Sequence, residues 1–140
     1  MAPTRLPRVL VAEDNPSLRT LIADVLSLEG CRVTEVGNAA DMQAAVMASE
    51  SAAGTATPFE LIVTDIRMPG KSGLEALAEL RGRGSRTRFV VITAFPEDAT
   101  ERRIRELDAN LLAKPFSLGE FRSLMKTLLH PVDPSEGGAA

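Results

Sequence analysis

The sequence contains little of what several protein classes require. Its 140 residues include one cysteine, Cys31, and neither tryptophan nor tyrosine. A single cysteine excludes an intramolecular disulfide framework and a zinc site built from several thiolates. Only five phenylalanines remain as aromatic side chains, so the platforms on which nucleic-acid bases stack are scarce. The composition is therefore typical of neither a disulfide-rich secreted domain nor a single-strand nucleic-acid binder.

Strong charge of one sign and long hydrophobic runs are also missing. The 16 basic and 19 acidic residues give a net charge of -3, which excludes a strongly basic nucleic-acid binder and a polybasic membrane-surface protein. No apolar run approaches the ~20 residues that cross a bilayer. Residues 1–7 lack the hydrophobic segment of a signal peptide. We therefore expect a cytoplasmic protein without direct contact to membrane or nucleic acid.

Length and composition indicate one globular domain. The hydrophobic content of 44% and the charged content of 25% are ordinary for a folded protein. A chain of this length buries enough surface to fold without cross-links. We predict an N-terminal extension over residues 1–7, one domain over 8–129, and a flexible Pro- and Gly-rich tail over 130–140.

Short apolar runs alternate with amphipathic segments along the chain. The runs predict strands at residues 9–12, 31–36, 61–64, 89–92 and 111–113. Helices are expected to start after Asn15, Asn38, Ser72 and Ser117, with a further helix over 96–107 and a loop over 49–58. Nearly continuous apolar strands separated by helices predict an α/β fold, an open doubly wound parallel sheet covered on both faces.

Polar side chains follow the predicted strands at their carboxyl ends. Glu13 and Asp14 follow the first strand, Asp65 the third, Thr93 the fourth and Lys114 the fifth. These ends meet at one edge of a parallel sheet, where ligands of such folds bind. Three neighbouring carboxylates repel one another, and the positive charge of a bound Mg²⁺ offsets this repulsion. A lysine and a hydroxyl suit phosphate oxygens, so the set predicts a phosphoryl-transfer site with an aspartate nucleophile.

These residues resemble those of the receiver domains of two-component response regulators, the CheY-like superfamily. The similarity rests on Glu13-Asp14, on Asp65 within D-I-R-M-P-G-K-S-G, on Thr93 within V-I-T-A and on Lys114 within K-P-F. It covers about residues 8–129. It implies a flavodoxin-like fold of five strands in the order 2-1-3-4-5. This strand order is that of the family and does not follow from the sequence pattern.

The resemblance also implies the chemistry of the acidic residues. Asp65 would accept a phosphoryl group from a histidine kinase or a histidine phosphotransfer protein. Asp14, Asp65 and the backbone carbonyl of Arg67 would bind Mg²⁺ directly, and Glu13 would reach the metal through water. Such a domain is a signalling switch and not an enzyme acting on another substrate, since it catalyses only its own phosphorylation and dephosphorylation.

The remaining implied roles concern how the phosphoryl group is sensed. Thr93 and Lys114 would contact the phosphoryl oxygens, and the bond before Pro115 is expected to be cis. Their contacts would alter a protein-binding surface formed by the fourth helix, fifth strand and fifth helix. Leu111 departs from the family, which usually has an aromatic residue there whose rotation accompanies switching. Arg67 and Phe95 would flank the path of attacking water, and we expect bulky Phe95 to slow hydrolysis.

The residues do not fit two other phosphate-handling sites. Gly70-Lys71-Ser72 ends like a P-loop, but Asp65 stands where that motif needs a glycine. Arg67 stands where aspartate-nucleophile phosphatases need a second carboxylate. Two alternatives stay open: a receiver-like scaffold that is not controlled by phosphorylation, and a receiver fragment of a hybrid kinase. Solvated surface positions are predicted for the arginines at 81, 83, 86, 88, 102, 103 and 105.

Overall fold

The computed structural model describes residues 6–51, 58–94 and 96–129. Most of the predicted extension over 1–7, the predicted tail over 130–140 and Phe95 lie outside the described residues. The strands are β1 (Arg8–Ala12), β2 (Arg32–Val36), β3 (Leu61–Asp65), β4 (Arg88–Thr93) and β5 (Asn110–Ala113). The helices are α1 (Pro16–Leu28), α2 (Ala39–Glu50), α3 (Gly73–Gly82), α4 (Asp98–Glu106) and α5 (Leu118–Leu129).

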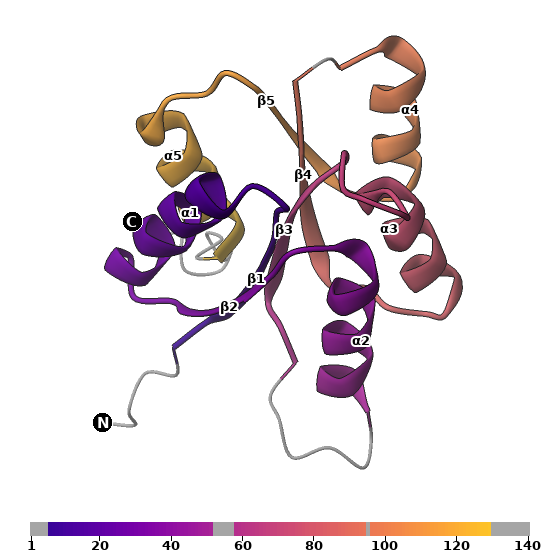
Figure 1. Cartoon of the computed structure of the whole chain (residues 1–140), viewed down its shortest axis with the longest axis horizontal. Helices are drawn as coiled ribbons and strands as arrows, with labels where there is room; N and C mark the ends of the chain where they lie inside the picture. The colour runs from indigo at the N-terminus through magenta and orange to yellow at the C-terminus, as the bar shows by residue number, and fades with distance from the viewer. Residues whose placement is uncertain (1–5, 52–57, 95, 130–140) are drawn as a thin grey trace, which may run out of the picture.

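The five strands form one parallel sheet in the order β2-β1-β3-β4-β5, which confirms the expected topology. Figure 1 shows α1 and α5 on one face of the sheet and α2, α3 and α4 on the other. In a parallel sheet each strand must be followed by a crossover that returns the chain to the same starting edge. All strand ends that carry polar residues therefore lie at one edge.

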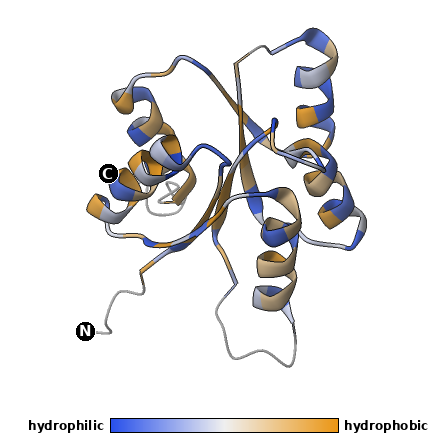
Figure 2. Cartoon of the chain, in the orientation of Figure 1, coloured by the Kyte–Doolittle hydropathy of each residue, from blue (hydrophilic) through white to orange (hydrophobic). Residues whose placement is uncertain are grey.

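Alternating side chains of the strands feed two separate hydrophobic cores. Leu10 and Ile62 pack with residues of α2, α3 and α4. Their neighbours Val11 and Val63 pack with residues of α1 and α5. Successive side chains of a strand point to opposite faces, and both faces are covered. The central strands β1, β3 and β4 are therefore hydrophobic over most of their length, which Figure 2 shows in orange, whereas the edge strand β2 carries Arg32 and Glu35. This is why the sequence contains apolar runs and not an alternating pattern.

Local polar contacts set the starts of two helices as predicted. The Asn15 side chain accepts hydrogen bonds from the backbone N–H groups of Ser17 at 3.0 Å and Leu18 at 3.1 Å. Ser72 accepts from the Glu75 backbone at 3.0 Å, and Glu75 accepts from the Ser72 backbone at 3.5 Å. These bonds satisfy N–H groups that the first helical turn leaves unpaired, and both helices follow strands whose ends carry site residues.

Two predicted boundaries are wrong. Ser49 belongs to α2 and not to the predicted loop, because its buried hydroxyl donates to the Val46 carbonyl at 2.8 Å inside the helix. The fourth helix begins at Asp98 and not at Pro96. The reason is that Glu97 has the extended backbone of an N-cap residue, with φ of -74° and ψ of 154°.

Arg81 does not lie on a solvated face as predicted. Its guanidinium donates to the carbonyls of Leu107 at 2.8 Å, Thr87 at 2.7 Å, Ser85 at 3.1 Å and Asp108 at 3.1 Å. Burial lowers the pKa of this guanidinium. The residue therefore joins the ends of α3 and α4 to the start of β4, on the side of the sheet opposite the site.

Candidate functional site

Four of the predicted residues occupy neighbouring strand ends. Glu13 follows β1, Asp65 is the last residue of β3, Thr93 is the last of β4 and Lys114 follows β5. β1 pairs with β3, β3 with β4 and β4 with β5. Glu13, Asp65 and Thr93 are only 2%, 6% and 7% exposed. The sheet thus gathers buried polar groups at one point of an otherwise apolar layer.

Asp65 is held from two sides. The Lys114 ammonium donates to Asp65 Oδ2 at 2.7 Å. The Arg67 backbone N–H donates to Asp65 Oδ1 at 3.0 Å. The Lys114 backbone N–H donates to the Thr93 carbonyl at 2.8 Å, and the Lys114-Pro115 bond is cis, as expected. Each oxygen of the Asp65 carboxylate therefore has a donor, and the lysine is tied to both β4 and β3.

Glu13 lies beside Asp65 with an incomplete set of partners. Its Oε1 accepts from the Asn15 backbone at 3.2 Å, and its carbonyl accepts from the Arg19 guanidinium at 2.8 Å. Its Oε2 is buried and, as an ionised carboxylate oxygen, finds no donor among the described residues. Burial, and after it the hydrogen bond and negative charge of Asp65, raise the pKa of Glu13 to about 8.

The pKa of Asp65 moves the other way. Burial by itself would raise this pKa, but hydrogen bonds from protonated Glu13 and from Lys114 outweigh it. The Arg67 N–H and the charge of Lys114 act in the same direction, so the pKa of Asp65 lies below its ordinary value. Of the two buried carboxyl groups, Asp65 is the one that is ionised at neutral pH, as a nucleophile must be.

The fit of this site to a divalent cation can be judged from its oxygen atoms. A buried Glu13 oxygen without a donor, next to an ionised Asp65, suits Mg²⁺, which takes one or two carboxylates and keeps several waters. Asp14 is exposed. Over residues 6–51, 58–94 and 96–129, no three or more acidic, His or Cys side chains are grouped as a metal site. Glu13 and Asp65 therefore fit a Mg²⁺ site that keeps several waters, and exposed Asp14 is not grouped with them.

Gly73 allows the chain to return against the end of β3. A Cβ atom at this position would lie 2.1 Å from the Asp65 carbonyl oxygen and 2.7 Å from Thr64 Oγ1. The Gly73 N–H donates to the Ile66 carbonyl at 2.9 Å. The absence of a side chain thus lets α3 start directly behind Asp65.

Arg19 is a site-supporting residue that the sequence analysis missed. Besides its bond to the Glu13 carbonyl, its guanidinium lies 3.6 Å from Glu35 on β2. A Cβ at Gly37 would come 3.2 Å from this guanidinium. The only sequence signal is a basic residue in the first turns of a helix, where the helix dipole favours acidic ones.

A shallow apolar hollow adjoins the site. It has a volume of about 620 Å³ and is lined by residues of α1 and of the segment that leads into α5. Leu21, Pro115 and Leu118 are among them, and Lys114 lies at its edge. Leu21 and Leu118 are 46% and 48% exposed.

Comparisons with known proteins agree with this geometry. The sequence pattern of the response regulator receiver domain matches residues 9–126. The transcriptional regulatory protein AruR of Pseudomonas aeruginosa is 34% identical over 135 residues, covering 96% of this chain and 54% of that protein. PdtaR of Mycobacterium tuberculosis is 34% identical over 114 residues, covering 81% and 52%. The chain spans about half the length of these relatives.

Solved structures share the fold. The chemotaxis protein CheY4 of Vibrio cholerae has a TM-score of 0.75 at 20% identity, covering 89% of this chain and 99% of that one. The receiver domain of HemR from Leptospira biflexa has a TM-score of 0.76 at 23% identity, covering 91% and 98%. The sheet order and the helix arrangement are therefore those of CheY-like domains. No helix in the described ranges is long and apolar enough to span a bilayer.

Proposed function

The chain belongs to the family of response regulator receiver domains of two-component systems, and on this basis we propose that Asp65 is its phosphoacceptor. The observation that carries the proposal is the buried Asp65 carboxylate with Lys114 at 2.7 Å and a lowered pKa. The phosphodonor is a histidine kinase or a histidine phosphotransfer protein. The phosphorylated domain switches a protein-binding surface.

The transfer itself needs little from the protein beyond placement and charge. An Asp65 carboxylate oxygen bonds to the phosphorus of a phosphohistidine, the P–N bond breaks, and the imidazole nitrogen leaves with the electron pair. Asp65 becomes an acyl phosphate that carries nearly two negative charges and three acceptor oxygens. Lys114, which pairs with the Asp65 carboxylate before transfer, then pairs with a phosphoryl oxygen.

Glu13, Asp14, Asp65 and the backbone carbonyl of Arg67 would hold Mg²⁺. The ion supplies positive charge that offsets the repulsion between these carboxylates and the incoming phosphoryl oxygens. Support comes from the buried Glu13 oxygen that lacks a donor. A cation held there would favour the ionised form of Glu13, so its binding would strengthen as the pH rises.

Switching is proposed to start at Thr93 and Lys114. Thr93 ends β4, and its hydroxyl can donate to a phosphoryl oxygen once one is present. The bond between the Lys114 N–H and the Thr93 carbonyl couples this movement to the chain after β5. The adjoining surface consists of α4, β5 and α5. The contacts of Thr93 and Lys114 before and after phosphorylation favour different conformations of this surface.

Leu111 has a packing role where the family usually has an aromatic residue. It lies opposite Val91 in the β4–β5 pairing and packs, half-buried, against the core below α2, α3 and α4. We propose that the change at Thr93 reaches the surface through backbone movement of β4 and repacking around Leu111.

The phosphodonor is proposed to dock over the apolar hollow. A phosphohistidine must come within bonding distance of Asp65, so the donor covers the surface beside Lys114. Leu18, Leu21 and Leu118 in the hollow offer apolar side chains that such a partner would bury.

For the output we propose contact with a protein or onward transfer of the phosphoryl group, as a single-domain regulator would act. A scaffold that is never phosphorylated is the main alternative, and a receiver fragment of a hybrid kinase is the other. The names of the longer relatives describe transcriptional regulators, and that activity belongs to those whole proteins.

The deciding experiment is intact mass spectrometry after incubation with Mg²⁺ and acetyl phosphate. We expect the parent to gain one phosphoryl group and Asp65→Ala to gain none. Asp24→Ala, an exposed aspartate on α1, serves as the matched control and should behave as the parent does. If no variant gains mass, beryllofluoride should still shift the amide resonances of Thr93 and Lys114; unchanged resonances would favour the scaffold.

A further inference from the structure

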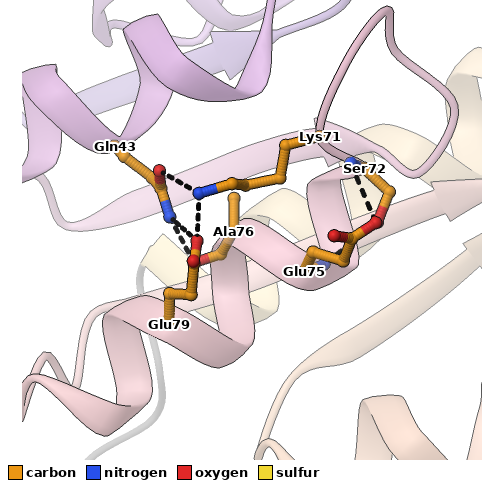
Figure 3. A network of polar contacts seen from close by, with 6 residues as sticks. All are labelled: Gln43, Lys71, Ser72, Glu75, Ala76 and Glu79. Carbon is orange, nitrogen blue, oxygen red and sulfur yellow. Dashed lines mark hydrogen bonds and ion pairs between the residues drawn. The ribbon is translucent and has the colours of Figure 1, made fainter.

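The side chains of Gln43, Lys71 and Glu79 form a polar network. Lys71 belongs to the segment that follows Asp65. Lys71, in the connection between β3 and α3, forms an ion pair with Glu79 of α3 and donates to Gln43 Oε1 of α2 at 3.1 Å (Figure 3). Gln43 Nε2 donates to Glu79 Oε2 at 2.6 Å and to the Ala76 carbonyl at 3.3 Å. Each of the three side chains therefore contacts the other two.

The groups in this network match one another chemically. The Gln43 amide turns its oxygen to the ammonium of Lys71 and its nitrogen to the carboxylate of Glu79. Hydrogen bonds first from Lys71 and then from Gln43 lower the pKa of Glu79. Glu79 is thus ionised over the working pH range, and the network stays intact near neutral pH.

The network anchors residues 66–72 to an element outside their own connection. The near end of this segment is tied by the bond from the Arg67 N–H to Asp65, and its far end by the bond from the Gly73 N–H to the Ile66 carbonyl. Both of these bonds lie within the β3–α3 connection. The Ile66 N–H donates to the Ile92 carbonyl of β4 at 3.2 Å, and Met68 is buried in the core. Lys71 adds a tie to α2 through Gln43 at the far end of the segment.

Such a network contributes little to global stability. Lys71 is 35% exposed and Glu79 is 50% exposed, and exposed ion pairs are screened by water and salt. The buried core under α2 and α3 holds these helices together in any case. Breaking the network should therefore affect the position of residues 66–72 far more than the folding of the domain.

We propose that Lys71 is a positioning residue of the phosphorylation site: clamped by Gln43 and Glu79, it holds residues 66–72 so that the Arg67 carbonyl stays in place for Mg²⁺. The proposal rests on the proposed function, because it assigns this segment to the metal site. Lys71 itself touches neither Asp65 nor the phosphoryl group. Loss of the clamp weakens Mg²⁺ binding by letting the segment move.

The test compares Lys71→Met with the parent and with a matched control. Arg103→Met removes one cation from an exposed ion pair of α4, Arg103–Glu106, which does not touch residues 66–72. Mg²⁺ affinity is measured by NMR titration, and amide hydrogen exchange of residues 66–72 is measured without metal. We expect Lys71→Met to weaken Mg²⁺ binding about three- to tenfold and to speed exchange in this segment, while Arg103→Met changes neither.

Two further readouts separate positioning from a general structural effect. The rate of phosphorylation by acetyl phosphate should fall in Lys71→Met at limiting Mg²⁺ and return to within about twofold of the parent at saturating Mg²⁺. The charge-reversed double variant K71E/E79K should recover part of the affinity, because the Gln43 amide can turn to face the exchanged charges.

The outcomes distinguish this proposal from the one on which it rests. A parent that binds Mg²⁺ and a Lys71→Met variant with unchanged affinity or unchanged segment exchange would overturn the clamp. Equal losses in Lys71→Met and Arg103→Met would also overturn it, because they would show a general charge effect. A parent that binds no Mg²⁺ would contradict the proposed metal site itself.

Discussion

Glu13 and Asp65 are adjacent buried carboxyl groups whose pKa values move in opposite directions. Burial raises the pKa of Glu13 to about 8, and donors from Glu13 and Lys114 lower that of Asp65. Without metal, these opposite shifts favour the proton on Glu13 over the proton on Asp65. This leaves the phosphoacceptor ionised and gives a cation a place to bind once the proton leaves.

The raised pKa of Glu13 predicts a pH-dependent stability of the metal-free protein. A carboxyl group with a folded pKa above its unfolded value stabilises the fold below the unfolded pKa, and this stability is lost as pH rises through the folded pKa. In EDTA we expect the urea midpoint to fall between about pH 5 and pH 8. Glu13→Gln should remove most of this decrease.

The lowered pKa of Asp65 acts in the opposite sense at lower pH. Its stabilising contribution is present above its unfolded pKa and is lost as pH falls through the folded one. The contribution of Asp65 to stability therefore changes at acid pH, below the pH range in which Glu13 acts. If the urea midpoint of Glu13→Gln falls between about pH 5 and pH 8 as much as that of the parent, the pH dependence does not come from Glu13.

Gly73 is required by the close approach of α3 to the end of β3. Gly73→Ala would place Cβ 2.1 Å from the backbone oxygen of Asp65, which cannot rotate away as a side chain can. We expect a destabilisation of about 1–3 kcal/mol, measured by urea unfolding, and slower phosphorylation. Gly82→Ala, at the other end of α3 with open space around it, is the control and should be neutral or slightly stabilising.

At the scale of elements, α4 is the helix with the weakest anchoring. Ile104 is its one fully buried side chain among the described residues, whereas the other helices bury three or more. Its N-cap residue, Glu97, makes no side-chain hydrogen bond to the first turn. An element with few buried contacts opens locally at low cost, which suits a helix that changes with phosphorylation.

This weak start predicts that a better N-cap stabilises α4. Glu97 already has the extended backbone of a cap residue, so Glu97→Ser needs only the hydroxyl to bond the free N–H groups of the first turn. We expect a gain of about 0.5–1 kcal/mol and slower amide exchange within α4. Glu97→Ala removes the same charge without adding an acceptor, and an equal gain in this variant would contradict the capping explanation.

At the scale of the whole molecule, the two faces of the sheet have different surfaces beside the site. α1 and α5 present exposed leucines around the hollow next to Lys114. The helix α4 on the other face presents mostly charged residues, with arginines 102, 103 and 105 exposed as predicted. We expect the phosphodonor to dock on the exposed leucines around the hollow, and α4 to take part in output together with β5 and α5.

This division predicts a variant that separates donor docking from chemistry. Leu21→Asp places a charge in the hollow beside Lys114 and should slow phosphotransfer from a cognate histidine kinase about tenfold or more. Phosphorylation by acetyl phosphate, which needs no docking surface, should stay near the parent rate. Leu28→Asp, on the same helix but 88% exposed and away from this hollow, should have little effect on either; equal losses in both variants would contradict the docking surface.

Local patterns in the sequence predict the elements and the polar residues that lie at the strand ends. Apolar runs and capping residues act between near neighbours in the chain, so strands, most helix starts and the polar residues at strand ends were predicted from it. The sheet order came from the resemblance to receiver domains. Other features depend on contacts between residues that are distant in the chain and become visible only in the fold: the burial of Arg81, the raised pKa of Glu13, the exposure of Asp14, and the bond that joins Lys71 to Gln43.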